Sequence, residues 1–128
     1  MPTTLRTLRS LAVAALCVTL AGAAAPAPRH TKLLKSEPAA NDTLTAPPKQ
    51  IALVFSERID LKVSRFKLAG AKGGGVTLGT ATVDAAKKGA PIVIPVTGAM
   101  GPGSYTVNWS VASDDGHAVK GAFGFVVK

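Results

Sequence analysis

The sequence has few of the residue types that carry out chemistry in proteins. It contains 1 Cys, 2 His and 7 Asp or Glu among 128 residues, and 1 Trp and 1 Tyr beside 4 Phe. The one thiol, Cys17, lies in an N-terminal apolar run. If that run is removed, the chain has no Cys for a disulfide, a thiolate metal site or a nucleophile. The scarcity of Trp and Tyr argues against stacking on nucleic-acid bases.

The first 23 residues have the order of a secretory signal peptide. Arg6 and Arg9 precede the apolar run 11–20, and small residues follow at 21–25. The run is shorter than the roughly 20 residues that a membrane-spanning helix needs. We expect residues 1–23 to be a signal peptide, residues 24–29 a flexible lead and residues 30–128 one domain. The sequence therefore predicts an exported, soluble, periplasmic protein.

The chain is basic, with a formal net charge of +8 at pH 7. Loss of Arg6 and Arg9 with the signal peptide would leave a charge of +6. The remaining Lys and Arg are spread along the chain, whereas nucleic-acid-binding proteins usually cluster them. The sequence therefore predicts a monomer that does not bind nucleic acid.

Short segments with the two-residue period of β-strands follow one another after residue 30. In them, Ile51, Leu53 and Phe55 are predicted to face inward, as are Phe66 and Leu68. The expected segments are 31–42, 50–56, 62–69, 76–83, 91–97, 105–111 and 123–127. None has a helical period, so the pattern predicts an all-β, immunoglobulin-like sandwich of about seven strands. A five-stranded barrel is the alternative, but it leaves two segments unexplained.

The bend between the last two strands, residues 113–117, holds two carboxylates and an imidazole. Asp115 and His117 are two residues apart and would project to the same side of an extended chain, whereas Asp114 would point elsewhere. His30 supplies the second imidazole, because the first strand of a sandwich can run beside the last. Two imidazoles and a carboxylate, without sulfur, suit Cu(II) or Zn(II). The alternative is that Asp114-Asp115-Gly116 is only a hairpin turn.

Catalysis is not indicated by the sequence. A serine hydrolase needs a nucleophile, a base and an orienting acid, and no serine lies in a recognisable nucleophile turn. Ser113 is near His117 in sequence only. We therefore expect a protein that is not an enzyme.

Three motifs occur in order along the chain. They are His30-x-Lys-Leu-x-x-Ser-x-Pro-Ala39, Ile51-x-Leu-x-Phe-Ser-Glu57 and Tyr105-x-Val-x-Trp-x-Val-x-Ser-x-Asp-Gly-His117. Through them, residues 30–128 resemble the CopC family of periplasmic copper-resistance proteins. The resemblance implies a Greek-key β-sandwich that binds one Cu(II) and carries or buffers copper without catalysis. The implied ligands are His30, Asp115 and His117, with Glu57 as an auxiliary group. The implied partners are the copper ion and a membrane copper transporter or another periplasmic copper protein.

Two departures from the family pattern bear on the site. Arg29 precedes His30, whereas in the family the first histidine is usually the mature N-terminus and chelates the metal with its free amine. The methionine-rich segment that holds Cu(I) in some members is absent, since only Met100 remains after the signal peptide. Two other hypotheses follow from the same sequence: a metal-free envelope domain that docks through its sandwich, and a copper oxidase. Arg29 and the lack of an aromatic substrate platform argue against the oxidase.

Overall fold

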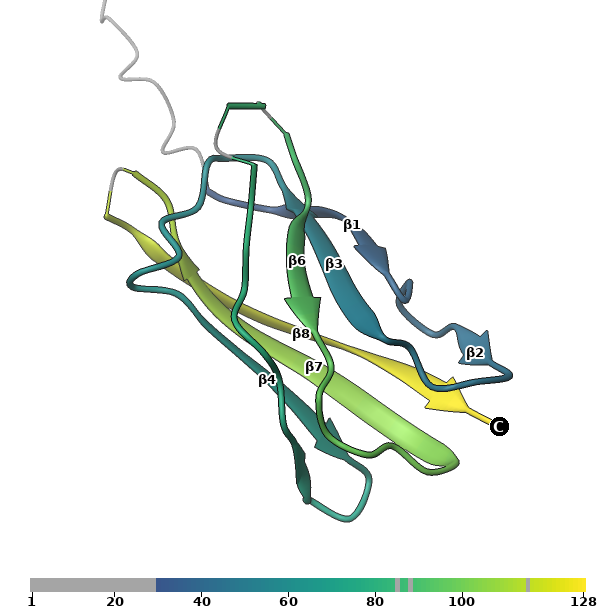
Figure 1. Cartoon of the computed structure of the whole chain (residues 1–128). Helices are drawn as coiled ribbons and strands as arrows, with labels where there is room; N and C mark the ends of the chain where they lie inside the picture. Colours follow the sequence, from purple (N-terminus) through teal and green to yellow (C-terminus); the bar gives the residue numbers. More distant parts are fainter. Residues whose placement is uncertain (1–29, 85, 88, 115) are drawn as a thin grey trace, which may run out of the picture.

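The described part of the chain folds into two facing β-sheets (Figure 1). The structure is a computed structural model, and it describes residues 30–84, 86–87, 89–114 and 116–128. Its strands are β1 (Leu33–Glu37), β2 (Thr43–Leu44), β3 (Gln50–Phe55), β4 (Arg65–Gly70), β5 (Gly75–Val76), β6 (Ile92–Pro95), β7 (Gly103–Ala112) and β8 (Ala118–Val127). Within these residues no helix is long and apolar enough to span a membrane. The predicted β-sandwich is confirmed, and the barrel alternative is wrong.

The smaller sheet has the order β1-β3-β6, and both of its strand pairs are antiparallel. The register of β1 shifts between Leu33 and Lys35, so Leu34 is an extra residue at the edge of the sheet. Its side chain is 65% exposed. A bulge and nearby charge at an edge strand hinder pairing with other chains. The opposite edge, β6, is partly covered by residues 77–82.

The larger sheet has the order β2-β8-β7-β4-β5. β7 and β8 are the longest strands, with 10 residues each, and they pair along their whole length. The two-residue strand β2 runs parallel to the end of β8, because Val126 N–H donates to Asp42 O at 2.8 Å and Lys128 N–H donates to Leu44 O at 2.8 Å. β2 was not predicted, since two residues carry no recognisable period.

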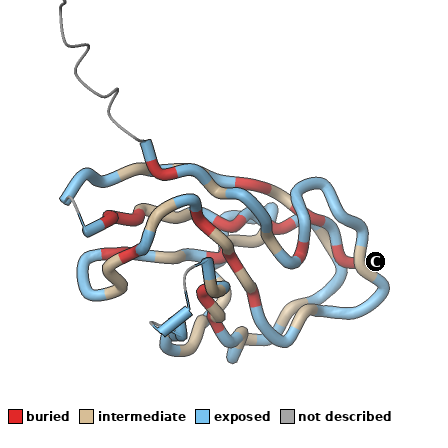
Figure 2. The backbone as a smooth tube through the Cα atoms, turned by 90° about the horizontal axis from the view of Figure 1, so that it is seen from above, coloured by how far each residue is buried: buried red, intermediate tan, exposed pale blue. Residues whose placement is uncertain are grey.

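The core lies between the sheets and is built from the alternating apolar residues of both (Figure 2). Ile51 and Leu53 of β3 and Val107 of β7 are 0% exposed. The inward faces predicted for residues 51–55, 66–68, 105–111 and 123–127 are confirmed. Tyr105 stacks on Phe125 with ring centroids 5.8 Å apart, and its hydroxyl donates to Gly101 O at 2.6 Å.

The strand predicted for residues 76–83 is largely wrong. The regular strand β5 ends at Val76, and beyond it the segment meets β6 only at the isolated bridges Leu78–Val96 and Thr82–Val93. Pro95 explains the interruption, because it has no N–H to donate to a ladder. The segment is held there by Gly79 N–H, which donates to Pro95 O at 2.7 Å.

Candidate metal site

Three segments far apart in the sequence meet at one end of the sandwich. They are the start of β1, the chain that follows β3, and the turn that joins β7 to β8 (Figure 1). These segments carry His30, Glu57 and His117 respectively. The contacts that bring them together are backbone pairings, so the arrangement depends on the fold rather than on the candidate ligands themselves.

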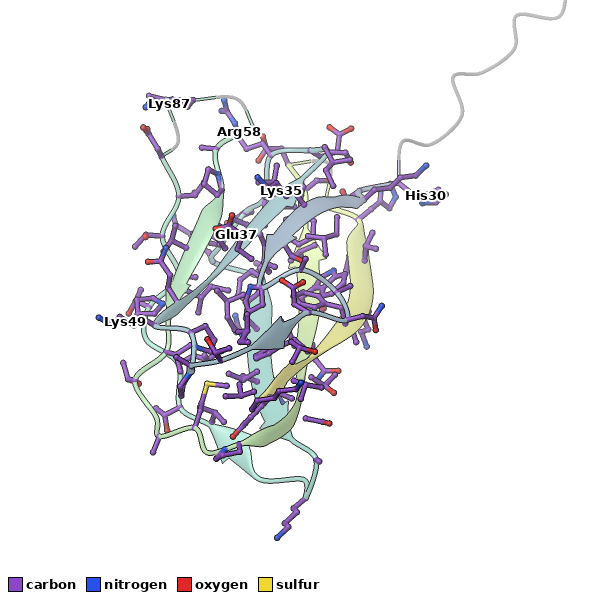
Figure 3. All side chains as sticks on the ribbon, turned by 90° about the vertical axis from the view of Figure 1, so that its right-hand side faces the viewer. His30, Lys35, Glu37, Lys49, Arg58 and Lys87 are labelled. Atoms are coloured by element: carbon purple, nitrogen blue, oxygen red, sulfur yellow. The ribbon has the colours of Figure 1, made fainter. Side chains whose placement is uncertain are left out.

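The start of β1 is fastened to the end of β3 through Ser56. Lys32 N–H donates to Ser56 Oγ at 2.8 Å, and Ser56 N–H donates to Lys32 O at 2.8 Å. Thr31, which precedes Lys32, is only 5% exposed. His30 is exposed and lies three residues before β1 begins (Figure 3). The fixed backbone at Lys32 thus restricts where the His30 imidazole can go.

The segment after β3 lies against the end of β7. Ile59 forms an antiparallel bridge with Ser113, and Asp60 N–H donates to Ala112 O at 2.9 Å. Ser64, 5% exposed, completes the contact: its hydroxyl donates to Asp60 O at 2.7 Å and accepts from Ala112 N–H at 3.2 Å. Glu57 is therefore held near the β7–β8 turn, and it is half-buried.

The β7–β8 turn begins after the final strand pair, Ala112–Ala118. Gly116 N–H donates to Ser113 O at 2.9 Å, and Gly116 has a φ of 81°. Only glycine adopts this left-handed conformation without strain, which explains its place in the turn. The backbone is therefore not extended at Gly116, whereas the predicted same-side projection of Asp115 and His117 assumed an extended chain. His117 and Asp114 are both exposed, and Asp115 lies outside the described residues.

The structure brings the segments of His30, Glu57 and His117 to the same end, but it does not display a complete ligand set. Among the described residues, no group of three or more His, Cys, Asp or Glu side chains is close enough to hold a metal ion. The donors at this end are imidazole nitrogens and carboxylate oxygens. That set fits Cu(II) or Zn(II) and offers no soft sulfur ligand for Cu(I).

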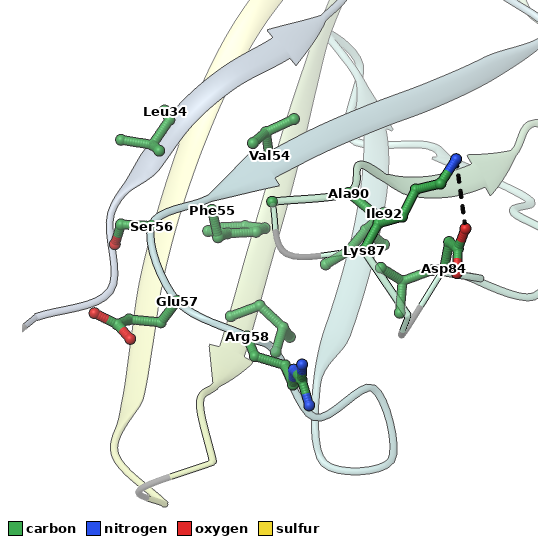
Figure 4. Close-up of a pocket in the computed structure, with 13 residues that line it drawn as sticks. Leu34, Val54, Phe55, Ser56, Glu57, Arg58, Asp84, Lys87, Ala90 and Ile92 are labelled. Carbon is green, nitrogen blue, oxygen red and sulfur yellow. Dashed lines mark ion pairs between the residues drawn. The ribbon is translucent and has the colours of Figure 1, made fainter.

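A cavity of about 430 Å³ opens beside Glu57, between the end of β3 and residues 83–92 (Figure 4). Val54, Phe55 and Ile92 contribute apolar lining, and Lys87 Nζ lies 3.8 Å from Asp84 Oδ2 in an exposed ion pair. Figure 4 shows the Glu57 carboxylate on the β1 side of the cavity, away from that ion pair. Glu57 therefore lines the cavity on the side that faces the start of β1.

An aromatic group lies between this end and the core. The Trp109 ring meets Phe55 edge-on at a centroid distance of 6.1 Å and lies 6.0 Å from Phe123. Gly121 pairs with Trp109 across β7 and β8, and a Cβ at Gly121 would come within 2.6 Å of the indole Cε2. Both rings belong to the core region: Phe123 is 9% exposed, and half-buried Trp109 packs against the core.

Sequence reasoning missed the residues that position the candidate ligands. Ser56 and Ser64 make the hydrogen bonds that fasten the segments, and Ile59 forms the bridge to the turn. The signals for Ser56 were its place directly after the alternating strand that ends at Phe55 and its presence in the motif Ile51-x-Leu-x-Phe-Ser-Glu57. Ser64 had no signal, because its two partners lie in different parts of the chain.

Taken together, the fold and this end of the molecule define a small β-sandwich protein with nitrogen and oxygen donors gathered where its strands end. A model of the CopC domain matches residues 33–128. The chain belongs to the CopC family, as the resemblance of its motifs predicted.

Relatives and solved structures agree with this assignment. The chain is 33% identical over 126 residues to copper resistance protein C of Xanthomonas campestris pv. juglandis, covering 94% of this chain and 97% of that protein. It is 38% identical over 100 residues to protein YobA of Escherichia coli (strain K12), covering 77% and 79%. The crystal structure of CopC from Methylosinus trichosporium OB3b superposes with a TM-score of 0.69 at 29% identity, covering 77% of this chain and 94% of that one. PcoC, a methionine-rich copper resistance protein from Escherichia coli, gives 0.65 at 31% identity, covering 78% and 100%.

Proposed function

We propose that this protein is an exported Cu(II)-binding protein that carries or buffers copper and catalyses no reaction. The observation that carries the proposal is the meeting of the His30, Glu57 and His117 segments at one end of the sandwich, fastened by backbone hydrogen bonds. The names of the relatives, copper resistance protein C, support copper as the metal. In this proposal His30, Asp115 and His117 bind the ion, and Glu57 adds negative charge beside it.

Cu(II) rather than Cu(I) follows from the donors that the chain offers. Cu(I) prefers thiolate and thioether ligands, whereas imidazole and carboxylate suit Cu(II). Met100 is the one thioether beyond the proposed signal peptide, and it packs against the core just before β7 begins. β7 separates it from the β7–β8 turn, so Met100 cannot join the candidate ligands. The solved relative PcoC is described as methionine-rich, and this chain differs from it in that respect.

The N-terminus decides whether the amine of His30 can join the site. Residues 1–23 are proposed to be removed on export to the periplasm, which would leave residues 24–29 ahead of the 30–128 domain. A start at Ala24 leaves His30 with an amide nitrogen and a side-chain ligand only. A start at His30 supplies a free amine beside its imidazole. The intact mass of the exported protein separates the two cases, and the second would require trimming after Arg29.

The metal proposal is tested by titrating the purified protein with Cu(II). We expect a weak visible absorption band and a tetragonal electron paramagnetic resonance spectrum that saturate at one equivalent. His117→Ala should abolish both signals, and His30→Ala should weaken binding. Asp114→Ala is the matched control, because it removes a neighbouring exposed carboxylate from the same turn. No saturable Cu(II) binding at micromolar concentration would refute the proposal.

A metal-free docking domain remains the competing function, and thermal unfolding distinguishes it. A ligand that binds only the folded state raises stability, by about 2.7 kcal/mol at a concentration of 100 times the Kd. We therefore expect the Tm to rise with Cu(II). A Tm that does not change with Cu(II) would favour the metal-free docking domain. The partner of such a domain would not be a copper transporter.

A further inference from the structure

The outer face of the larger sheet carries positive charge and no negative charge in its three central strands. Along β4, β7 and β8, residues alternate between the core and the outside, and Leu68, Val107 and Phe123 share the inner side. The remaining residues form the outer face. We call this the basic face; its exposed and half-buried members are Arg65, Lys67 and Ala69 of β4, Ser104, Thr106, Asn108 and Ser110 of β7, and Ala118, Lys120, Ala122, Gly124 and Val126 of β8.

The register places the three cations of the basic face close together. Arg65 pairs with Ser110, which pairs with Lys120, so these residues form one row across the sheet. Lys67 pairs with Asn108 in the next row on the same side. Strands lie about 4.8 Å apart and same-side neighbours about 6.8 Å apart, so the cations attach to the sheet within about 12 Å of one another. Their charges therefore act together on any ligand that meets this face.

No acidic residue balances these charges within the three strands. Neither Asp nor Glu occurs in β4, β7 or β8, whose residues are all described. The nearest carboxylates along the chain lie beyond strand ends. Asp60, for example, accepts from Lys62 N–H at 2.9 Å within its own loop. Arg65 Nη1 donates to Ser64 O at 2.9 Å, which steadies the guanidinium at the edge of the face without neutralising it.

The side chains around the cations are short. Serine, threonine, asparagine, alanine and glycine surround Arg65, Lys67 and Lys120, so the three long side chains reach furthest from the sheet. All three are exposed. A broad, flat, negatively charged partner can contact all of them at once. A curved or deeply shaped partner gains nothing from this surface.

The composition of the basic face selects among anionic partners. The aromatic rings of these strands, Tyr105, Trp109 and Phe123 among them, lie on the core side, so the face has no stacking platform for nucleic-acid bases. It also lacks the buried aromatic or aliphatic anchors on which tight protein interfaces depend. Basic residues alone are sufficient at an anionic membrane, where attraction to lipid headgroups is electrostatic.

We propose that the basic face docks this protein on membrane surfaces rich in anionic phospholipid. The interaction is peripheral, because no apolar segment of the face enters the bilayer. It does not depend on copper binding. Docking would also affect the position of the candidate copper ligands. His117 precedes Lys120 by three residues, or roughly 10 Å of strand. A docked molecule therefore holds His117 and the β7–β8 turn close to the membrane surface.

The test is binding of the purified exported protein, without residues 1–23, to vesicles. One set contains phosphatidylcholine with phosphatidylglycerol, and the other contains phosphatidylcholine alone. Each basic residue near an anionic surface contributes roughly fivefold to partitioning, so the triple variant Arg65→Gln, Lys67→Gln, Lys120→Gln should bind anionic vesicles about a hundredfold more weakly. Binding should also fall as salt is raised.

The matched control is Lys35→Gln, Lys49→Gln, Arg58→Gln, which removes the same charge from exposed residues that lie outside β4, β7 and β8 and are labelled in Figure 3. It should keep nearly all of the vesicle binding. Near-ultraviolet circular dichroism confirms that both triple variants are folded. Equal loss in the two triples would overturn the proposal, because net charge alone would then explain binding. Equal binding to neutral vesicles would also overturn it, as would tighter binding to duplex DNA that depends on the same three residues.

Discussion

Lys32 and Ser56 are joined by two hydrogen bonds in opposite directions, each 2.8 Å long. The backbone of Lys32 both donates to the Ser56 side chain and accepts from the Ser56 N–H. Lys32 lies two residues after His30, and Ser56 lies one residue before Glu57. The pair therefore fixes the chain that enters β1 against the chain that leaves β3. It is therefore the contact through which the fold can position His30 beside Glu57.

Ser56→Ala should loosen the start of β1 without disturbing the core. Loss of this exposed hydrogen bond is expected to lower the free energy of unfolding by about 0.5 to 1 kcal/mol. Cu(II) affinity should fall by roughly twofold to fivefold, because His30 is then less well positioned. Isothermal titration and urea unfolding measure the two effects. Ser56→Thr, which keeps the hydroxyl, should restore both, and unchanged affinity in Ser56→Ala would mean that His30 does not need this contact.

Ser64 performs the equivalent task for the segment that carries Glu57. Its buried hydroxyl bridges Asp60 O and Ala112 N–H. Ser64→Ala removes both hydrogen bonds, and leaving buried partners unsatisfied costs about 1 to 3 kcal/mol. Urea unfolding should show that loss. Ser104→Ala, at an exposed strand position, is the control and should change stability by no more than about 0.5 kcal/mol. A Ser64→Ala protein as stable as the control would contradict the assigned role.

Gly121 must lack a side chain because the Trp109 indole occupies the space in which a Cβ would lie. Gly121→Ala should therefore destabilise the protein by about 3 kcal/mol through overpacking. Gly101→Ala, where nothing lies within 4 Å of the added Cβ, should have little effect. The double variant Gly121→Ala, Trp109→Phe should recover part of the loss, since the smaller ring leaves room. Equal stability of the two single glycine variants would show that β8 shifts to accept the methyl group.

The sequence predicted the sheets better than the loops. Alternation along β3, β7 and β8 identified Ile51, Val107 and Phe125 as core residues because each strand has one buried face and the period of a strand is fixed. The strand prediction for residues 76–83 failed because the pairing of this segment depends on Pro95, a residue of another strand. The Ile59–Ser113 bridge could not be predicted either, since no local pattern specifies which loops the topology brings together.

The candidate site was predicted through motifs rather than through geometry. The spacing of Asp115 and His117 was interpreted on the assumption of an extended chain, in which residues two apart project to the same side. Gly116, between them, has a φ of 81° and is not extended. The placement of His30 at the same end followed from two arguments: the first strand of a sandwich can run beside the last, and the motifs resemble the CopC family. The shared end of the sandwich now supports that placement, while the ligand role of each residue, Asp115 above all, stays a prediction.

Trp109 should report copper binding directly. It is the only Trp in the chain, and it contacts Phe55, two residues before Glu57. Cu(II) bound at this end has d–d absorption that accepts excitation energy from a nearby indole, whereas Zn(II) is d¹⁰ and has none. Fluorescence titration should therefore show emission falling until one equivalent of Cu(II) and unchanged by Zn(II). His117→Ala should abolish the quenching and Asp114→Ala should preserve it. Quenching that persists in His117→Ala would place the copper ion elsewhere on the molecule.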